Sequence, residues 1–245
     1  MSETLSEQVE NYTASLESEQ IIRAQRTIML AGITGAGKDT LLKNLLTDEQ
    51  YSGDYYRIVT HTTRGPRDNQ DEREEDGVDY HFVSEAALSD LLKDHQMVEV
   101  NQFGDKFYGT SIGEFVIAQE KNRLAIGDVD INGIIAFHHI AQEMVTAIFI
   151  VPPDYDTWQG RLLRRYNGST EKLAESWSVR RGIAINELEQ ALAVPYFHFV
   201  INDDIERATG VIHSIAHREK DFFKRADDEA RLAARALLDT IKTVG

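Results

Sequence analysis

The residues best suited to chemistry lie in a glycine-rich segment near the start of the chain. Gly32, Gly37 and Lys38 stand at the spacing of the motif G-x-x-x-x-G-K-[S/T], while Asp39 replaces the hydroxyl residue that would bind magnesium. The backbone N–H groups of such a turn point into one concavity, and the next helix adds the partial positive charge of its N-terminus. The pattern predicts a nucleoside triphosphate site in which Lys38 reaches the β- and γ-phosphates.

The flanks of this segment predict the strand and helix that the loop needs. Residues 27–31 form an apolar run of the buried-strand type, and residues 41–46 continue as an amphipathic helix. Gly35, Ala36 and Thr40 complete the expected loop. The alternative is an ordinary glycine-rich turn, but the three fixed positions and both flanks favour phosphate binding.

A second group of residues is suited to a phosphate ester. Arg64 and Arg67 lie on either side of a Gly-Pro pair, and Pro66 stiffens the turn between them. Two guanidinium groups held this way fit a dianionic phosphate, because each can donate two parallel hydrogen bonds. Tyr80 and Tyr108 could add phenolic donors.

Two carboxylates, Glu99 and Asp130, stand in otherwise apolar stretches, where an ionised group needs a partner. The edge of guanine is a suitable partner, because its N1–H and exocyclic amine are adjacent donors that one carboxylate can accept. Adenine has no donor at N1 and would leave the carboxylate unpaired. The carboxylates therefore favour a guanine nucleotide.

Composition excludes several classes of partner and site. The 245 residues include 26 Lys and Arg against 41 Asp and Glu, a net charge of −15, which repels nucleic acid and anionic membranes. The absence of cysteine excludes disulfides and thiolate metal sites. There is no apolar run of the ~20 residues that span a bilayer and no signal-peptide pattern, so we expect a cytoplasmic protein.

The remaining periodicity predicts alternating strands and helices, and hence an α/β fold with a mostly parallel sheet. Strands are expected at 56–62, 97–102, 106–108, 124–128, 145–151 and 198–202, and helices at 85–95, 111–121, 155–165 and 171–192. The acidic stretch 68–79 is expected to be a solvated loop.

Both ends of the chain are expected to be peripheral. Residues 1–26 have apolar positions at helical spacing and could be a surface helix, an oligomer contact or a frayed tail. From about residue 212 the chain reads as helical, with an apolar stripe that would pack on its own domain or on a second subunit. The stripe consists of Ala226, Ala230, Ala233, Leu237, Ile241 and Val244.

Several separated segments together resemble the guanylate kinases, a family of phosphate-loop nucleoside monophosphate kinases. Residues 60–67, Thr-His-Thr-Thr-Arg-Gly-Pro-Arg, are similar to the family's T-T-R-x-P-R motif, and residues 77–84, Gly-Val-Asp-Tyr-His-Phe-Val-Ser, follow as they do in the family. Further matches are Glu99, residues 108–110, residues 128–130 with Gly133, and residues 200–204. The resemblance covers roughly residues 27–213.

The resemblance implies a phosphate-loop NTPase-type parallel sheet flanked by helices. It also implies a small mixed β/α insertion that binds GMP, at about 58–110, and a helical lid at about 161–181. The domain would span 27–213, between a polar, helical extension at 1–26 and an amphipathic C-terminal helix at 214–245.

The resemblance also implies a role for each matching residue. The GMP phosphate would be held by Arg64, Arg67, Tyr80 and Tyr108, and guanine would be read by Thr60, Glu99, Thr110 and Asp130. Lys38 and Asp128 would act at the transferring phosphoryl group, with the lid arginines Arg161, Arg165 and Arg180. Arg181 competes with Arg180 for its position, and Arg180 is preferred because it lies seven residues before Glu187. Asn202 would lie beside the adenine of ATP.

The implied reaction is Mg²⁺-dependent transfer of the γ-phosphoryl group of ATP to GMP, completed by lid closure. Asp39 and Asp128 would hold the metal, directly or through water. Two alternatives remain: a guanylate-kinase-like scaffold domain that binds phosphorylated peptides, and a kinase of the same fold acting on another small phosphate ester. A homo-oligomer formed through the terminal helices is a further expectation.

Overall fold

The computed structural model describes residues 3–69, 72–218 and 223–244. The chain forms two compact units, each assembled from three separate segments. The first unit comprises Met1–Thr27, Asp54–Gly127 and Asn132–Val145, and the second comprises Ile28–Gly53, Asp128–Ile131 and Thr146–Gly245.

The main sheet has five strands in the order β11-β10-β1-β9-β2. Their bounds are Thr27–Ala31 for β1, Tyr55–Arg57 for β2, Leu124–Asp128 for β9, Val145–Val151 for β10 and Phe197–Ile201 for β11. β10 pairs with β11 and β2 pairs with β9, both in parallel. Every residue of β1 is buried, as expected for a central strand with a continuous apolar run. The expected α/β fold with a parallel sheet flanked by helices is confirmed.

The first unit contains a second, four-stranded sheet in the order β6-β3-β8-β7. Its strands are β3 (His61–Thr62), β6 (His81–Phe82), β7 (Met97–Phe103) and β8 (Lys106–Ser111). The helices near these strands in the sequence are α4 (Glu85–Lys93), α5 (Ile112–Glu120) and α6 (Ile131–Ala141), followed by the 3₁₀ turn η1 (Gln142–Met144). β3 pairs with β6 in parallel and with β8 antiparallel, so the strand directions of this sheet are mixed.

The strand expected at 56–62 is wrong as a single element. The chain leaves the main sheet after Arg57 and enters the four-stranded sheet at His61. Ile58 and Val59 between them are buried. The β-branched residues Ile58, Val59 and Thr60 continue the strand-like pattern across the change of sheet, and residue type alone does not show which strand is the neighbour.

The expectation of a solvated loop at 68–79 is wrong for part of this stretch. Asp68–Asn69 (β4) and Glu72–Arg73 (β5) pair as a short antiparallel ladder. The Glu74 side chain beyond it is only 9% exposed, whereas residues 75–78 are exposed.

The N-terminal extension packs on the first unit and is not a frayed tail. Thr4 caps α1 (Leu5–Glu10) in a capping box with Glu7, and Ser15 caps α2 (Leu16–Arg23). α1 packs against α4 and β7, and α2 packs against α5. The Tyr12 hydroxyl donates to Met97 O at 2.5 Å, which ties the extension to β7.

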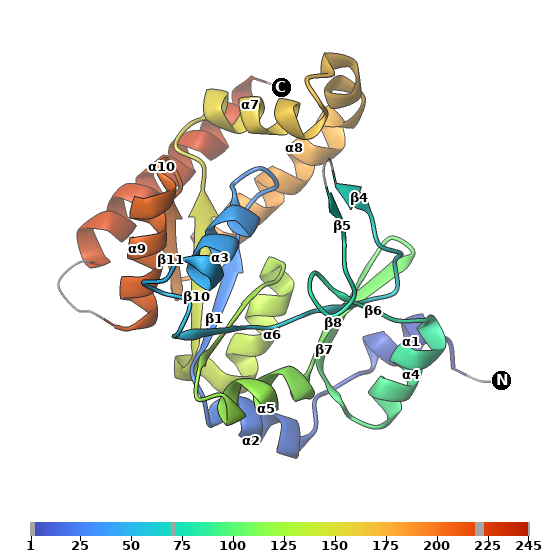
Figure 1. Cartoon of the computed structure of the whole chain (residues 1–245). Coiled ribbons are helices and arrows are strands. Elements are labelled where there is room, and N and C mark those ends of the chain that lie inside the picture. Colours follow the sequence, from blue (N-terminus) through green and yellow to red (C-terminus); the bar gives the residue numbers. More distant parts are fainter. Residues whose placement is uncertain (1–2, 70–71, 219–222, 245) are drawn as a thin grey trace. The chain divides into compact units, whose positions relative to one another are not determined.

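Helices of the second unit follow the phosphate loop and the later strands (Figure 1). They are α3 (Lys38–Thr47), α7 (Tyr155–Arg165), α8 (Thr170–Ala193), α9 (Ile205–Ala216) and α10 (Phe223–Thr243). α10 packs against α8 and β11, and α3 packs against α9. The helical C-terminal region is thus two helices, α9 and α10, with the residues 219–222 between them outside the described part of the chain.

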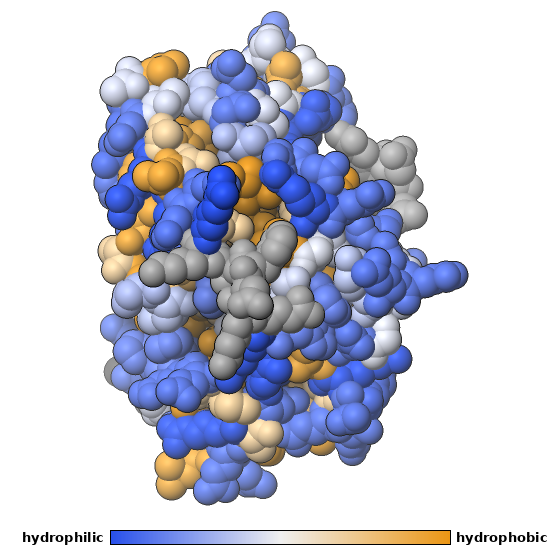
Figure 2. Space-filling model, turned by 90° about the vertical axis from the view of Figure 1, so that its left-hand side faces the viewer, coloured by the Kyte–Doolittle hydropathy of each residue, from blue (hydrophilic) through white to orange (hydrophobic). Residues whose placement is uncertain are grey.

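The apolar stripe of α10 is largely covered within the second unit. Ala230, Leu237 and Ile241 are buried, Ala234 is buried in place of the expected Ala233, and Val244 is 60% exposed. The molecular face that includes α9 and α10 is mostly hydrophilic, with scattered apolar residues (Figure 2). Oligomerisation through this helix therefore stays a prediction. Among the described residues, no helix is both long and apolar enough to cross a membrane.

The packing of α2 predicts that the extension contributes to stability. Ile22 is fully buried, so Ile22→Ala should lower the free energy of unfolding by about 2–4 kcal/mol in urea denaturation, because it leaves a cavity. Leu16→Ala is the matched control on the same helix, because Leu16 is 77% exposed and its loss should change stability little. Equal effects of the two substitutions would contradict the packing described for α2.

Candidate functional site

The phosphate loop of the second unit has a conformation that only glycine adopts readily. Gly32 and Gly37 have φ angles of 150° and 93°, in the region that L side chains disfavour. A Cβ atom on Gly32 would also lie 2.5 Å from Ile150 O, and one on Gly37 would collide with the Asn202 amide. The motif glycines are therefore required by both backbone conformation and close approach.

Side chains from α7 and from the residue after β11 hold the loop through its carbonyl groups. Trp158 on α7 is buried, and its indole N–H donates to Thr34 O at 2.8 Å. Asn202, just after β11, donates to Ala36 O at 2.8 Å, and Arg161 Nη1 donates to the same oxygen at 3.1 Å. Arg161 Nη2 also donates to Asn202 O at 2.7 Å. Arg161 and Asn202, both predicted from the sequence, thus lie at the loop.

Lys38 and its neighbours begin α3. The Lys38 ammonium donates to Gly32 O at 2.6 Å, and this bond folds its side chain back over the loop. Asp39 and Thr40 are exposed in the first turn of the helix. The Asp39 carboxylate is therefore available to solvent and to a ligand.

The other expected lid arginines are not gathered at the loop. Arg165 is exposed near the end of α7. Arg180 Nε donates to the Tyr166 hydroxyl at 2.5 Å, with the guanidinium 5.2 Å from the centre of that ring. Arg181 instead donates to Ile241 O at 2.8 Å and to Lys242 O at 2.9 Å, at the end of α10. The contacts of Arg181 are therefore structural, which favours Arg180 as the lid residue.

The second unit also contains three carboxyl groups that were expected at the site or that interact with Lys38. Asp128 ends β9, and Asp130 follows two residues later; both are half-buried. Burial raises the pKa of Glu187 on α8 to about 7, with Lys38 opposing the rise and Asp130 adding to it. Its Oε2 is buried and has no hydrogen-bond partner among the described residues. Asp130, expected to read guanine, thus belongs to the unit that carries the phosphate loop.

The expected phosphate-binding residues of the first unit surround Arg64, which is 7% exposed. Its guanidinium lies 4.8 Å from the centre of the Tyr80 ring, and the Tyr80 and Tyr108 rings are 6.2 Å apart. Glu74 pairs with Arg64 through both carboxylate oxygens, at 2.5 and 2.8 Å. The exposed Arg67 donates its backbone N–H to Glu74 at 2.8 Å.

The expected guanine-reading residues Glu99 and Thr110 are brought together by the pairing of β7 with β8. They stand opposite each other in the ladder, and the buried Thr110 hydroxyl donates to Glu99 Oε1 at 2.9 Å. Asn101 Nδ2 donates to Glu99 Oε2 at 2.7 Å. Glu99 is 8% exposed, so its carboxylate is fixed and largely desolvated.

Thr60, the remaining expected guanine contact, adjoins a buried polar cluster centred on Glu114. Glu114 accepts the backbone N–H of Val59 at 2.9 Å and the Tyr56 hydroxyl at 3.2 Å, and it shares a 3.0 Å hydrogen bond with His81 Nε2. Burial, followed by the Glu114 charge, raises the pKa of Tyr56 to about 12. The cluster fixes the backbone immediately before Thr60.

Sequence reasoning missed Glu74, Asn101 and Glu114. Glu114 lies in the apolar helix α5, and the rule that singled out Glu99 could have found it. Glu74 lies in a stretch dense in Asp and Glu, where nothing in the residue pattern distinguishes one carboxylate from the others.

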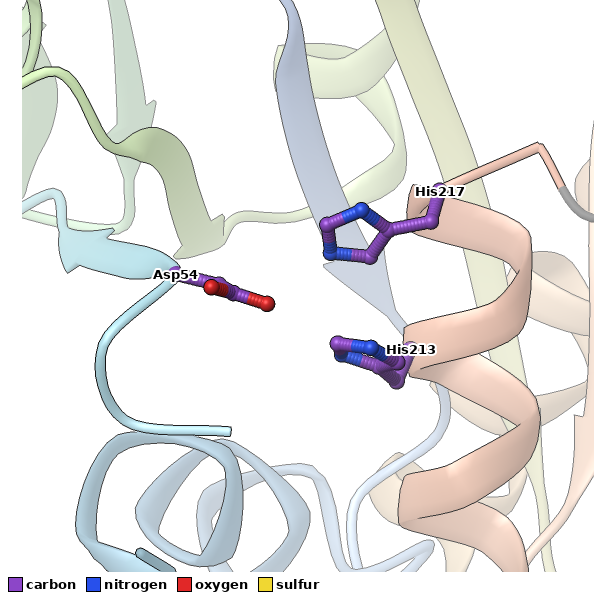
Figure 3. A group of neighbouring side chains, drawn as sticks. All are labelled: Asp54, His213 and His217. Carbon is purple, nitrogen blue, oxygen red and sulfur yellow. The ribbon is translucent and has the colours of Figure 1, made fainter. Parts of the chain in front are cut away.

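His213 of α9 and His217, which caps the C-terminus of that helix, extend towards the same side (Figure 3). The rings of His213 and His217 are 4.2 Å apart, and the Tyr51 ring is 4.7 Å from that of His213. Asp54, also labelled in the figure, belongs to the first unit. Within the second unit, the pair supplies two ligands, fewer than the three protein ligands of a typical catalytic zinc site.

Comparison with known proteins agrees with the motifs. The family model described as guanylate kinase matches residues 24–219. A guanylate kinase of Sus scrofa is 32% identical over 183 residues, which are 75% of this chain and 87% of the relative. Guanylate kinases of Homo sapiens and Schizosaccharomyces pombe are 33% and 31% identical, covering 75% and 83% of this chain and 88% and 96% of the relatives.

A solved structure shares the fold. The guanylate kinase from Anaplasma phagocytophilum superposes with a TM-score of 0.58 at 22% identity, over 80% of this chain and 87% of that structure. At this identity the likeness concerns the fold alone.

The raised pKa of Glu187 predicts a stability that depends on pH. Its ordinary pKa is 4.5 and its folded value is about 7, so the folded protein binds this proton more tightly. The contribution to stability is therefore lost as the pH rises from 4.5 to 7. Glu187→Gln has no such proton, so its stability does not fall in this way. The free energy of unfolding of the variant minus that of the wild type should therefore rise by on the order of 2 kcal/mol between acidic and alkaline pH.

Urea denaturation at pH values below and above this range measures the effect. Glu175→Gln is the matched control, because Glu175 is exposed on the same helix. The same pH dependence in both variants would contradict the burial assigned to Glu187.

Proposed function

The chain belongs to the guanylate kinase family and is therefore a kinase, and from this premise we propose that it transfers the γ-phosphoryl group of ATP to GMP, giving ADP and GDP. The observation that carries the proposal is that one chain holds both halves of such a site. The second unit has a glycine-rich phosphate loop with its lysine, and the first unit has a paired carboxylate and an arginine–tyrosine cluster.

Guanine is assigned to the Glu99 carboxylate. Each of its oxygens already accepts one hydrogen bond, from Thr110 or from Asn101. A carboxylate can accept two adjacent N–H donors at once, one on each oxygen. Guanine supplies two such donors, at N1 and at its exocyclic amine, whereas adenine has no donor at N1. The Thr60 backbone lies in the same unit, and its hydroxyl is proposed to add to this recognition.

The phosphate of GMP is assigned to Arg64, Arg67, Tyr80 and Tyr108. Arg64 is buried and stacked on Tyr80, so its plane is fixed before a ligand arrives. Arg67 is exposed and is proposed to close on the phosphate when it binds. A guanidinium suits this role because it donates two parallel hydrogen bonds to phosphate oxygens.

The polyphosphate of ATP is assigned to the loop from Gly32 to Thr40 and to the N-terminus of α3. Lys38 has three donors and uses one on Gly32 O, so its ammonium can turn towards the β- and γ-phosphates. Asn202 is buried against Ala36 and is proposed to lie beside the adenine. Phosphoryl transfer needs no covalent protein intermediate, because positioning and charge neutralisation provide most of the catalysis.

Magnesium is the proposed cofactor, and the donor chemistry of the second unit fits it. Asp39 and Asp128 present carboxylates, the ligand type that Mg²⁺ prefers, and Asp39 is exposed beside the loop. The bound ion would neutralise charge on the phosphates. Asp128 and Asp39 would hold it directly or through water.

Lid closure is proposed to bring the arginines of α7 and α8 to the transferring group. Arg161 is already hydrogen bonded to the phosphate loop, whereas Arg165 is exposed and Arg180 is bonded to Tyr166. Closure would add positive charge and exclude water, which limits hydrolysis of ATP.

Nucleotide specificity tests the proposal. In a coupled assay of ADP release, GMP should be phosphorylated with kcat/KM roughly 100-fold or more above AMP, because AMP has no N1–H to donate to the Glu99 carboxylate. CMP and UMP at matched concentrations complete the comparison. A folded protein that binds GMP without turnover would support the scaffold alternative. Equal turnover of AMP and GMP would contradict the role of Glu99.

The adjacent lid arginines give a second, matched test. Arg180→Met should lower kcat roughly 100-fold with little change in unfolding, because Arg180 is proposed to neutralise transition-state charge. Arg181→Met should instead lower stability by about 1–2 kcal/mol, because it loses two hydrogen bonds to α10. Steady-state kinetics and urea denaturation separate the two effects. The reverse pattern would assign the lid role to Arg181.

A further inference from the structure

Arg64 is held by hydrogen bonds along one edge of its guanidinium. Nη1 and Nη2 donate to the two carboxylate oxygens of Glu74, at 2.5 and 2.8 Å, and Nη1 also donates to Gly65 O at 2.8 Å. Both protons of Nη1 and one proton of Nη2 are therefore used. The Arg64 and Glu74 side chains are 7% and 9% exposed, so this pair is largely out of water.

Within the described part of the chain, the other edge of the same guanidinium has no such acceptor. Arg64 Nε is buried and finds no hydrogen-bond partner among the described residues. Together with the second proton of Nη2, it forms the remaining two-donor fork of the side chain. An unsatisfied buried donor is unfavourable, so an acceptor at this edge would be stabilised.

Glu74 is itself held in place by a second contact. It accepts the backbone N–H of Arg67 at 2.8 Å, which joins the two arginines of the Arg-Gly-Pro-Arg turn through one carboxylate. The Tyr80 ring lies 4.8 Å from the Arg64 guanidinium and limits its tilt. Burial alone would raise the pKa of Glu74, but the hydrogen bonds from Arg64 and Arg67 outweigh it and lower the pKa. The pair thus stays ionised.

A carboxylate on a phosphate-binding arginine can act in two opposite ways. It can occupy the place of the phosphate and compete with the substrate, or it can orient the arginine and leave a donor edge for the substrate. The contact with the Arg67 backbone and the unused Nε edge favour orientation, because Glu74 has no need to leave when an anion binds at that edge.

We propose that Glu74 is a positioning residue for GMP, which holds Arg64 by its Nη1 and Nη2 atoms so that the Nε edge receives a phosphate oxygen. This inference rests on the proposed function, because it assumes that Arg64 binds the substrate phosphate. It adds a residue that contacts Arg64 and the Arg67 backbone, and it assigns a task to one carboxylate of the acidic stretch.

The test replaces Glu74 with its neutral isostere. Glu74→Gln keeps one acceptor and loses the paired grip, so KM for GMP should rise about tenfold while kcat and KM for ATP change less than about threefold. Glu75→Gln is the matched control, because it removes the same charge from an exposed neighbour. The control should leave KM for GMP near the wild-type value.

A ligand without the phosphate separates positioning from damage to the site. By calorimetry, Glu74→Gln should weaken GMP binding about tenfold and leave the affinity for guanosine unchanged. In an Arg64→Ala background, the further change Glu74→Gln should affect GMP affinity less than about threefold, because the guanidinium that it orients is gone and only its contact with the Arg67 backbone remains.

Three results would overturn the inference. A lower KM for GMP in Glu74→Gln would make Glu74 a competitor of the phosphate. An equal rise in KM for GMP in the Glu74 and Glu75 variants would mean that Glu74 acts only through its charge. An equal loss of affinity for GMP and for guanosine would mean that Glu74 only supports the structure of the site. Failure of the proposed function is distinct, since the wild-type protein itself would then neither bind nor phosphorylate GMP.

Discussion

Both halves of the site depend on one constraint, the free-energy cost of moving charged and polar groups out of water. A buried ionised group is tolerated only with a partner, and the partner then fixes its position. Glu99 is held between Thr110 and Asn101, and Arg64 between Glu74 and Tyr80. The groups of the first unit that are proposed to recognise GMP are therefore oriented without a ligand.

In the second unit, the buried polar groups that need partners are backbone carbonyl groups of the phosphate loop. The phosphate loop must direct its N–H groups towards a ligand, so its carbonyl groups point the other way and need donors. Trp158, Arg161 and Asn202 supply those donors at Thr34 and Ala36. Arg161 thus links a helix of the expected lid to the loop that holds ATP in the proposed reaction.

The arginines of the expected lid differ in the groups that they contact. Arg161 is bonded to the loop, while Arg180 is bonded to Tyr166 within the expected lid segment. Arg181, its neighbour in sequence, is bonded to the end of α10. Adjacent residues of one helix point in different directions, so these two consecutive arginines have different contacts. The C-terminal helix is in this way joined to α8.

The sequence by itself determined the fold class, the phosphate loop and the family, because these depend on local spacing and on the order of motifs along the chain. Gly32, Gly37 and Lys38 could be recognised because a short loop imposes its geometry on adjacent residues. Tertiary structure alone decided which charges are paired. Glu74 was hidden among similar acidic residues, the change of sheet after Arg57 was not marked in the residue pattern, and the anchoring of Arg181 depended on the position of α10. Each of these features depends on contacts between residues that are distant in sequence, or on the direction of one side chain. Local residue types and spacing determine neither of these.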